Sequence, residues 1–288
     1  MALMAAVAPR ALRRMSRRTQ DELRAMTERL RMRPGFIMIG VHRGGTTSMF
    51  RMLEAHPQVV HAYRKGVYYF DLNYFRGPAW YYGHFPLAGQ ARRGARGFGE
   101  PVAFEASGYY IYHPFALERM AKDLPDVRLV VMLRDPVERA YSDFKHESAR
   151  GFERETFEKA LELEDSRLAG EVDRMRDDIR YESLHHRHHS YRHRGQYAEQ
   201  LERVFEHYPR SQVHVLESDA YFSQPAREYG RLLEFLGLKP FQPAQFAKLN
   251  ARPGAPMQSR TYEMLREFYR PHDERLTELL GQAPSWAR

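Results

Sequence analysis

The stretch FIMIGVHRGGTTSMFRMLEAHP, Phe36 to Pro57, decides the fold. Its apolar run, Phe36–Val41, is bounded by glycines, which is typical of a buried strand. A helical pattern then runs from Thr46 to Ala55 and stops before Pro57. A strand, a glycine-rich loop and a helix in this order aim backbone N–H groups and the positive end of the helix dipole at one point. The stretch therefore predicts an anion-binding loop at the edge of a sheet.

The loop itself is rich in hydrogen-bond donors. Arg43 supplies a charged fork, and the residues that allow close backbone approach or carry hydroxyl groups are Gly44, Gly45, Thr46, Thr47 and Ser48. A strand-to-helix turn with nothing bound is the alternative. The phosphate-binding pattern of nucleotide kinases would begin at Gly40, but it requires a lysine where Thr46 stands. The loop therefore differs from a kinase loop at the residue that contacts the transferred phosphate.

A second apolar run, Leu129–Leu133, ends in Arg134. A strand that held magnesium for phosphoryl transfer would offer a carboxylate at this point. Sulfuryl transfer fits better, because the moving group carries less charge and arginine and backbone donors can stabilise its transition state. We therefore expect a site that works without a metal ion.

The rest of the chain alternates strands with helices. Further strands are predicted at Arg128–Leu133 and Gln212–Leu216, and helices at Phe152–Leu168, Gln196–His207, Pro225–Leu236 and Ser259–Leu280, with another beginning at Pro136. This alternation predicts an α/β fold whose parallel sheet binds ligands at the carboxyl ends of its strands.

Composition narrows the class of protein. The 288 residues are 43% hydrophobic, enough for one large domain or two small ones, and no window approaches the roughly 18 apolar residues of a membrane span. The sequence has no cysteine, which excludes disulfides and thiolate catalysis and fits a reducing compartment, so we expect a cytoplasmic protein. The net charge of +8 suits an anionic partner, although genomic base composition explains it equally well. Nothing in the sequence matches a nucleic-acid-binding motif, so we expect no nucleic-acid partner.

We predict a basic N-terminal extension over residues 1–33 and one main domain over residues 34–288. We expect the extension to be helical. An organellar transit peptide or a helix that contacts a membrane surface peripherally is the alternative.

Two further segments have two interpretations each. The aromatic stretch Tyr63–Pro86 is too rich in Gly, Pro and polar residues for a core element; it is either a loop packed on its own rings or a wall that binds an acceptor. The cluster HHRHHSYRHR, His185–Arg194, is interpreted as an exposed basic helix or loop rather than a metal site, because arginines would repel a cation.

Five motifs, in order, resemble the PAPS-dependent sulfotransferases, which use 3′-phosphoadenosine 5′-phosphosulfate. The nearest members are the heparan-sulfate-type carbohydrate enzymes and their bacterial relatives. The motifs, in chain order, are GVHRGGT from Gly40, KGVYYFD from Lys65, EASGY from Glu105, LRDPVERAYS from Leu133 and the helical LREFYRPHDERLTELLG from Leu265. The resemblance implies a P-loop-like three-layer fold, with a central parallel sheet flanked by helices.

The resemblance also implies roles for the donor-side residues. Arg43 takes the place of the family's loop lysine and would touch the 5′-phosphate and the bridging oxygen, while residues 44–48 would cradle the phosphosulfate. Arg134 and Ser142 would bind the 3′-phosphate, although a salt bridge to a nearby carboxylate is the alternative for Arg134. Lys248 or Arg252 would close over the nucleotide.

The acceptor side departs from the family pattern. The glutamate that acts as base in the heparan-type enzymes stands here as Gly66, the family's next histidine is Tyr68, and the lysine of its E-K-T-P motif is Ala106. A hydroxyl acceptor still needs its proton removed.

Other residues must therefore supply the base. Glu105 is the first candidate, Asp71 the second, and His113 and His42 follow. The sequence thus predicts transfer of a sulfuryl group from PAPS, with PAP as product, to a hydroxyl of a carbohydrate, a glycolipid or another small molecule. The rival hypothesis is a non-catalytic module that binds PAP, PAPS or an anionic glycan and has lost the base. The sequence leaves the acceptor and the oligomeric state open.

Overall fold

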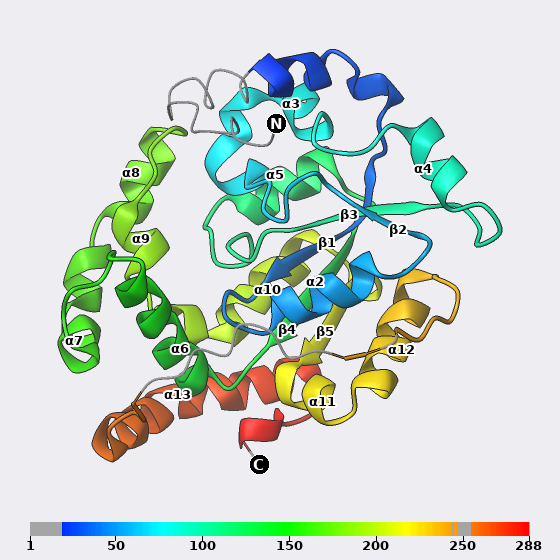
Figure 1. Ribbon diagram of the computed structural model, residues 1–288. Coiled ribbons are helices and arrows are strands. Elements are labelled where there is room, and N and C mark those ends of the chain that lie inside the picture. The colour runs from blue at the N-terminus through cyan, green and yellow to red at the C-terminus, as the bar shows by residue number, and fades with distance from the viewer. Residues whose placement is uncertain (1–18, 244, 247–254, 288) are drawn as a thin grey trace, which may run out of the picture.

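The computed structural model describes residues 19–243, 245–246 and 255–287. Within them, five parallel strands form one sheet in the order β2-β3-β1-β4-β5 (Figure 1). The strands are β1 Pro34–Gly40, β2 Val59–His61, β3 Val102–Ala106, β4 Arg128–Leu133 and β5 Val213–Glu217. The predicted α/β class and parallel sheet are confirmed.

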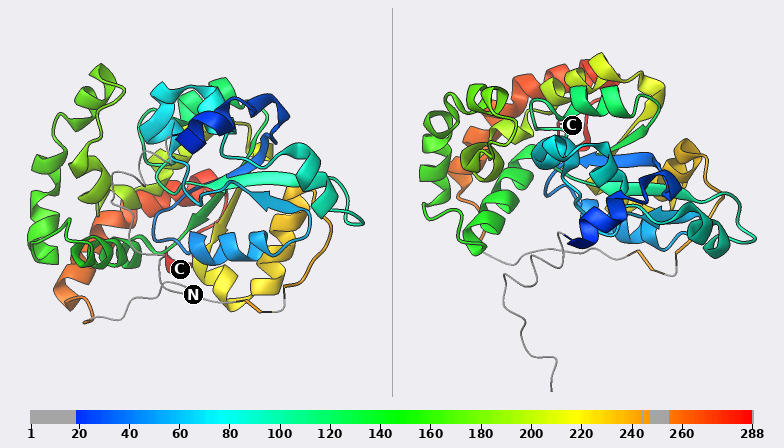
Figure 2. Two further views of the ribbon diagram at one scale, coloured as in Figure 1. Left: turned by 45° about the horizontal axis from the view of Figure 1, so that its top comes forward. Right: turned by 90° about the horizontal axis from the view of Figure 1, so that it is seen from above.

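Helices connect the strands and cover the sheet. They are α2 Thr46–Glu54, α3 Pro78–Tyr82, α4 Ala88–Gly94, α5 Ala116–Asp123, α6 Pro136–Ala149, α7 Phe157–Leu168, α8 Glu171–Asp177, α9 Leu184–His188, α10 Tyr197–His207, α11 Ser218–Ser223, α12 Pro225–Leu236 and α13 Ser259–Leu280. Figures 1 and 2 show α6 to α9 together at one side of the molecule, beyond the sheet.

The central strand β1 is buried on both faces, and its alternating side chains contribute to two cores. Ile37 and Ile39 pack with residues of α5, α10 and α13, such as Leu201. Met38 packs on the other face with residues of α2 and α12, such as Leu53. The sheet therefore lies between two helical layers, as the three-layer prediction requires.

The predicted element boundaries hold for several segments and shift for others. Arg128–Leu133, Pro225–Leu236 and Ser259–Leu280 match the structure. The helix predicted from Phe152 instead begins at Phe157, because the side chain of Thr156 accepts a hydrogen bond from the backbone N–H of Lys159 and caps the helix there.

The aromatic stretch 63–86 does contribute to the core, so the prediction that it could not was wrong. Tyr69, Phe70 and Tyr81 are each at most 1% exposed, and the rings of Tyr69 and Tyr81 stack 4.6 Å apart. Their hydroxyl and main-chain groups have partners inside the protein: Tyr81, for example, donates to Glu105 at 3.0 Å. Aromatic packing thus outweighs the local Gly and Pro content.

The described part of the N-terminal extension begins with a helix at residues 19–25. The prediction for residues 1–18 falls outside the described residues. Among the helices that the structure describes, none has the length and apolar character needed to cross a bilayer.

Candidate active site

The glycine-rich loop joins the end of β1 to the start of α2, as predicted. Gly45 adopts a φ of 89° at the N-cap of α2, a conformation that favours glycine. Gly44 lies against the neighbouring strand: a Cβ there would stand 2.5 Å from the carbonyl oxygen of Met132 and 2.7 Å from Cγ2 of Val41. The loop is therefore packed against β4, and it leads directly into the N-terminus of the nine-residue helix α2.

The second predicted motif lies beside this loop. Arg134 follows β4, and its Nη1 donates to the carbonyl oxygen of Arg43 at 3.4 Å. The side chain of Arg43 turns towards α6, where its Nε donates to Oγ of Ser142 at 3.1 Å. Residues about a hundred positions apart thus meet at the carboxyl edge of the sheet. Arg134 also lies 3.5 Å from Glu138, so the salt bridge considered as its alternative role is present too.

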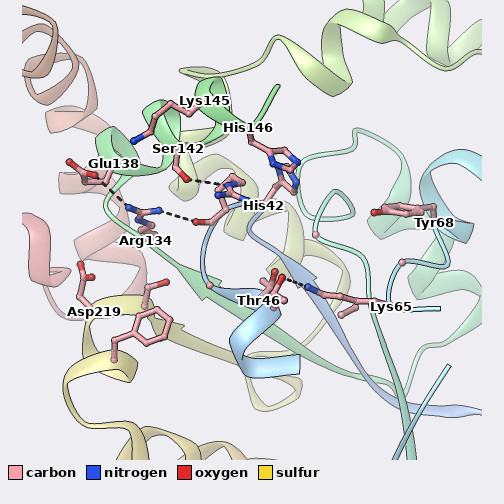
Figure 3. Close-up of a pocket in the computed structure, with 18 residues that line it drawn as sticks. His42, Thr46, Lys65, Tyr68, Arg134, Glu138, Ser142, Lys145, His146 and Asp219 are labelled. Atoms are coloured by element: carbon pink, nitrogen blue, oxygen red, sulfur yellow. Dashed lines mark hydrogen bonds and ion pairs between the residues drawn. The ribbon is translucent and has the colours of Figure 1, made fainter. Parts of the chain in front are cut away.

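A cavity of about 420 Å³ opens between the loop and α6. Figure 3 shows Arg134, Glu138, Ser142 and Lys145 on one side of it, and Lys65 and Tyr68 on the other. The cationic side chains on its wall are Arg43, Lys65, Arg134 and Lys145. Two carboxylates, Glu138 and Asp219, also line it, on the side of Arg134. Because four cationic side chains and only two carboxylates line it, the cavity suits an anion bound between the loop and α6.

Lys65 is a site residue to which the sequence interpretation assigned no role. Its Nζ donates to Oγ1 of Thr47 at 2.5 Å, at the start of α2. Burial, together with Arg51 and Arg43, lowers the pKa of Lys65 to about 8. An anion in the loop would favour its charged form. The sequence signal was its position at the start of the motif KGVYYFD. Lys145 is a second lysine in the lining of this cavity.

Glu105, the first candidate base, lies in β3 and is fully buried. It is not among the residues that line the cavity. Its carboxyl oxygens accept hydrogen bonds from the hydroxyl groups of Tyr81 at 3.0 Å, Tyr110 at 3.0 Å and Ser107 at 2.9 Å. Burial raises the pKa of Glu105 to about 7 in spite of these donors. The side chain is thus held behind the cavity wall.

Asp71, the second candidate, is 3% exposed and is also not part of the cavity lining. Its Oδ1 accepts from the N–H of Leu72 at 2.7 Å, whereas its buried Oδ2 has no hydrogen-bond partner among the described residues. Burial raises the pKa of Asp71 to about 7. His113, the third, is 3% exposed, and burial keeps its pKa well below the usual value.

The acceptor-side departures from the family pattern are structurally linked. A Cβ at Gly66 would stand 2.4 Å from the ring of Tyr68, so the tyrosine ring occupies the space that a side chain at position 66 would need. Tyr68 is 37% exposed and lines the cavity. Burial and Asp71 raise the pKa of Tyr68, so its phenol stays protonated.

His42, the fourth candidate, does line the cavity. Its Nδ1 lies 3.0 Å from Oδ1 of Asp143 on α6. Asp143 is 2% exposed and was not singled out from the sequence. Its signal was its position, directly after Ser142 in the predicted 3′-phosphate motif.

The histidine cluster 185–194 is not exposed, so that prediction was wrong. Three of its histidines are at most 6% exposed, and each makes a hydrogen bond: His186 with the hydroxyl of Tyr109 at 2.7 Å, His188 with Glu147 at 2.9 Å and His189 with the carbonyl of Phe152 at 2.9 Å. Burial and Arg194 lower the pKa of His186 to about 3. An imidazole that is neutral can be buried in a protein interior. The number of basic residues in this cluster therefore did not predict its burial.

Arg252, predicted to close over the nucleotide, and its alternative Lys248 lie outside the described residues.

Comparison with known proteins agrees with this geometry. The family model described as "Sulfotransferase domain" matches residues 33–252. The chain is 28% identical over 279 residues to human heparan sulfate glucosamine 3-O-sulfotransferase 3B1, a match that covers 88% of this chain and 65% of that protein. It is 26% identical over 318 residues to the membrane-associated sulfotransferase kil1 of Dictyostelium discoideum, covering 88% and 66%.

A solved structure shows the same arrangement. The sulfotransferase from Alicyclobacillus acidocaldarius superimposes with a TM-score of 0.67 at 26% identity, covering 89% of this chain and 100% of that one. The chain therefore belongs to the sulfotransferase family, which confirms the resemblance noted in its motifs. It spans about 65% of the length of the human relative.

Proposed function

We propose that this protein is a PAPS-dependent sulfotransferase that transfers a sulfuryl group to a hydroxyl of a carbohydrate acceptor, without a metal ion. The observation that carries the proposal is the contact between the two donor-side motifs: Arg134 donates to the Arg43 carbonyl at 3.4 Å, and Arg43 donates to Ser142 at 3.1 Å. The human relative, named for glucosamine 3-O-sulfation, supports the acceptor class.

The residues present fit the two anionic ends of PAPS. The amides of residues 45–47 and the hydroxyls of Thr46 and Thr47, at the N-terminus of α2, would hold the 5′-phosphosulfate. Gly44 and Ser48, predicted to contribute as well, do not line the cavity, and their N–H groups donate to backbone carbonyls. Arg134 and Ser142, across the loop, would hold the 3′-phosphate, because a guanidinium and a hydroxyl both donate to phosphate oxygens. PAPS supplies an activated sulfuryl group. Once it is bound, Lys65 and Arg43 would face the developing charge on the leaving phosphate.

In this proposal, cationic side chains neutralise the developing negative charge, as magnesium does in phosphoryl transfer. Four of them line the cavity, and two are guanidinium groups that remain charged at any physiological pH. We therefore expect full activity in the presence of a chelator. Loss of activity with EDTA, restored by a divalent cation, would contradict the metal-independent part of the proposal.

The test is transfer of ³⁵S from labelled PAPS to a panel of acceptors: heparan sulfate, a glucosamine oligosaccharide, a simple phenol and galactosylceramide. We expect labelling of a carbohydrate acceptor by the wild-type protein and roughly thirtyfold less by Arg134→Ala, at one PAPS concentration well below the wild-type KM. Arg227→Ala, at an exposed arginine on α12, is the matched control and should keep its activity. PAP binding without transfer to any acceptor would instead favour a non-catalytic binding module.

A further inference from the structure

His42 and Asp143 form a pair at the cavity wall that the donor-binding role does not use. His42 precedes Arg43 in the loop, and its side chain is 36% exposed, whereas that of Asp143 is 3% exposed. Since Nδ1 of His42 faces Oδ1 of Asp143 at 3.0 Å, the ring nitrogen that remains for a substrate is Nε2. An imidazole backed by a buried carboxylate is the arrangement that orients a proton acceptor.

The carboxylate of Asp143 is itself fixed in place. Arg139, fully buried, donates from Nη1 to Oδ2 of Asp143 at 2.9 Å, and Nη1 of Arg194 lies 3.6 Å from the same oxygen. Burial alone would raise the pKa of Asp143, but His42, Arg139 and Arg194 outweigh it, so that its pKa lies well below the usual value. Asp143 therefore stays charged and can stabilise an imidazolium at position 42.

The other groups that face His42 are compatible with proton uptake. The ring centroid of His146 lies 5.5 Å from that of His42, and burial, His42 and Arg43 lower the pKa of His146 to about 4, so this neighbour is neutral. Glu147 lies 3.9 Å from His146 and is already bonded to His188. Arg43 is a cation beside His42 in the loop, and it opposes the charge that Asp143 favours.

The backbone of His42 lies beside Gly108, and its ring faces Asp143 on α6. A Cβ at Gly108 would stand 3.5 Å from the backbone nitrogen of His42, so the loop rests on the turn after β3. The small residues Gly66, Ala106 and Gly108 line the cavity there and cannot accept a proton. The carboxylates of the lining, Glu138 and Asp219, lie instead on the side of Arg134 (Figure 3).

We propose that His42 is the general base of sulfuryl transfer and that Asp143 is its positioning residue, an inference that rests on the proposed function above. The acceptor oxygen attacks sulfur while Nε2 of His42 takes the hydroxyl proton. The new sulfur–oxygen bond forms as the bond between sulfur and the bridging phosphate oxygen breaks. That oxygen keeps the electron pair, and PAP leaves facing Arg43 and Lys65. The histidine would thus supply what the glycine at position 66 cannot.

The experiment compares wild type, His42→Ala and Glu105→Gln with the carbohydrate acceptor that the wild type labels. We expect His42→Ala to lower kcat by roughly 10²–10⁴-fold, while its affinity for PAP, measured by calorimetry, stays within threefold of wild type. Added imidazole should raise the rate of His42→Ala at least tenfold. A purely structural role of His42 would not predict such a rescue. Glu105→Gln should stay within threefold of wild type.

Asp143→Asn gives a second readout. It should lower kcat and move the acid limb of the kcat profile to lower pH, because the imidazolium loses its carboxylate. If Asp143→Asn does not fold, the His42→Ala result still decides. Retained activity in His42→Ala, or a loss of activity that parallels a loss of PAP affinity, would overturn the inference and leave the proposed function intact. Absence of transfer by the wild type would instead refute the proposed function, and the inference with it.

Discussion

The effect of replacing Glu105 with glutamine on the free energy of unfolding, relative to wild type, should be more favourable at pH 8 than at pH 5. Glu105 is fully buried in β3, and burial raises its pKa from 4.5 to about 7. In the unfolded chain the carboxyl loses its proton near pH 4.5, but in the folded protein it keeps the proton up to about pH 7. The wild type's free energy of unfolding therefore falls as pH rises through this window.

The expected magnitude follows from the size of the pKa change. Each unit of pKa corresponds to about 1.4 kcal/mol, so ionising Glu105 costs the fold roughly 3 kcal/mol above pH 7. Glutamine keeps an oxygen that can accept from Tyr81 and Tyr110, and it carries no charge at any pH. The stability of Glu105→Gln relative to wild type should therefore rise by about 2–3 kcal/mol between pH 5 and pH 8.

Urea unfolding followed by circular dichroism at the two pH values measures this difference. Glu162→Gln, at a 68% exposed side chain on α7, is the control and should change stability by less than about 0.5 kcal/mol at either pH. A difference between Glu105→Gln and wild type that is the same at pH 5 and pH 8 would refute the reasoning. It would mean that the hydroxyl donors, rather than burial, set the protonation of this carboxyl.

Three further changes, one of them with a matched control on α12, test the loop and its neighbours. Lys65→Met should weaken PAP binding by about tenfold in calorimetry, because a charge-assisted hydrogen bond is lost; unchanged affinity would remove Lys65 from the site. Gly44→Ala should destabilise the protein by about 1–3 kcal/mol in thermal unfolding, because its Cβ would stand 2.5 Å from the Met132 carbonyl oxygen. Gly230→Ala, in α12 with nothing within 4 Å of its Cβ, should instead stabilise it by about 0.5–1 kcal/mol; equal effects of the two glycine changes would contradict the loop geometry. Ser142→Ala should reduce PAP affinity roughly fivefold, since one neutral hydrogen bond is worth about 1 kcal/mol, and no reduction would place the 3′-phosphate elsewhere.

The sequence predicted those parts of the fold whose local signals are strong. The apolar runs before the glycine loop and at residues 128–133 predicted β1 and β4, which are neighbours in the sheet. Such runs are informative because buried parallel strands are continuously apolar. Two strands were not predicted. Val59–His61 has only three residues, and Val102–Ala106 carries Glu105 in its middle, which no local pattern would bury. Ser107 and Tyr110, two of the hydroxyl donors to that carboxyl, follow it closely in the chain, but the third donor, Tyr81, comes from a segment 24 positions away.

The contact between the glycine loop and Arg134 could be predicted from the sequence, whereas the contacts made by His42 and Lys65 could not. The loop and Arg134 carry motifs, so their meeting could be expected once the strands were assigned as parallel neighbours. The pairing of His42 with Asp143 joins residues 101 positions apart, and Lys65 reaches the loop from a stretch interpreted through its aromatic residues. These contacts depend on side-chain directions that spacing along one sequence does not give.

The most direct test of the central claim is calorimetric titration of PAP and of AMP, which lacks the 3′-phosphate, into the wild type and Arg134→Ala. If Arg134 binds the 3′-phosphate, its loss should cost about 2 kcal/mol, roughly thirtyfold in affinity, for PAP. The same change should leave AMP binding within threefold. Equal weakening of both nucleotides, or a wild type that does not bind PAP, would contradict the account.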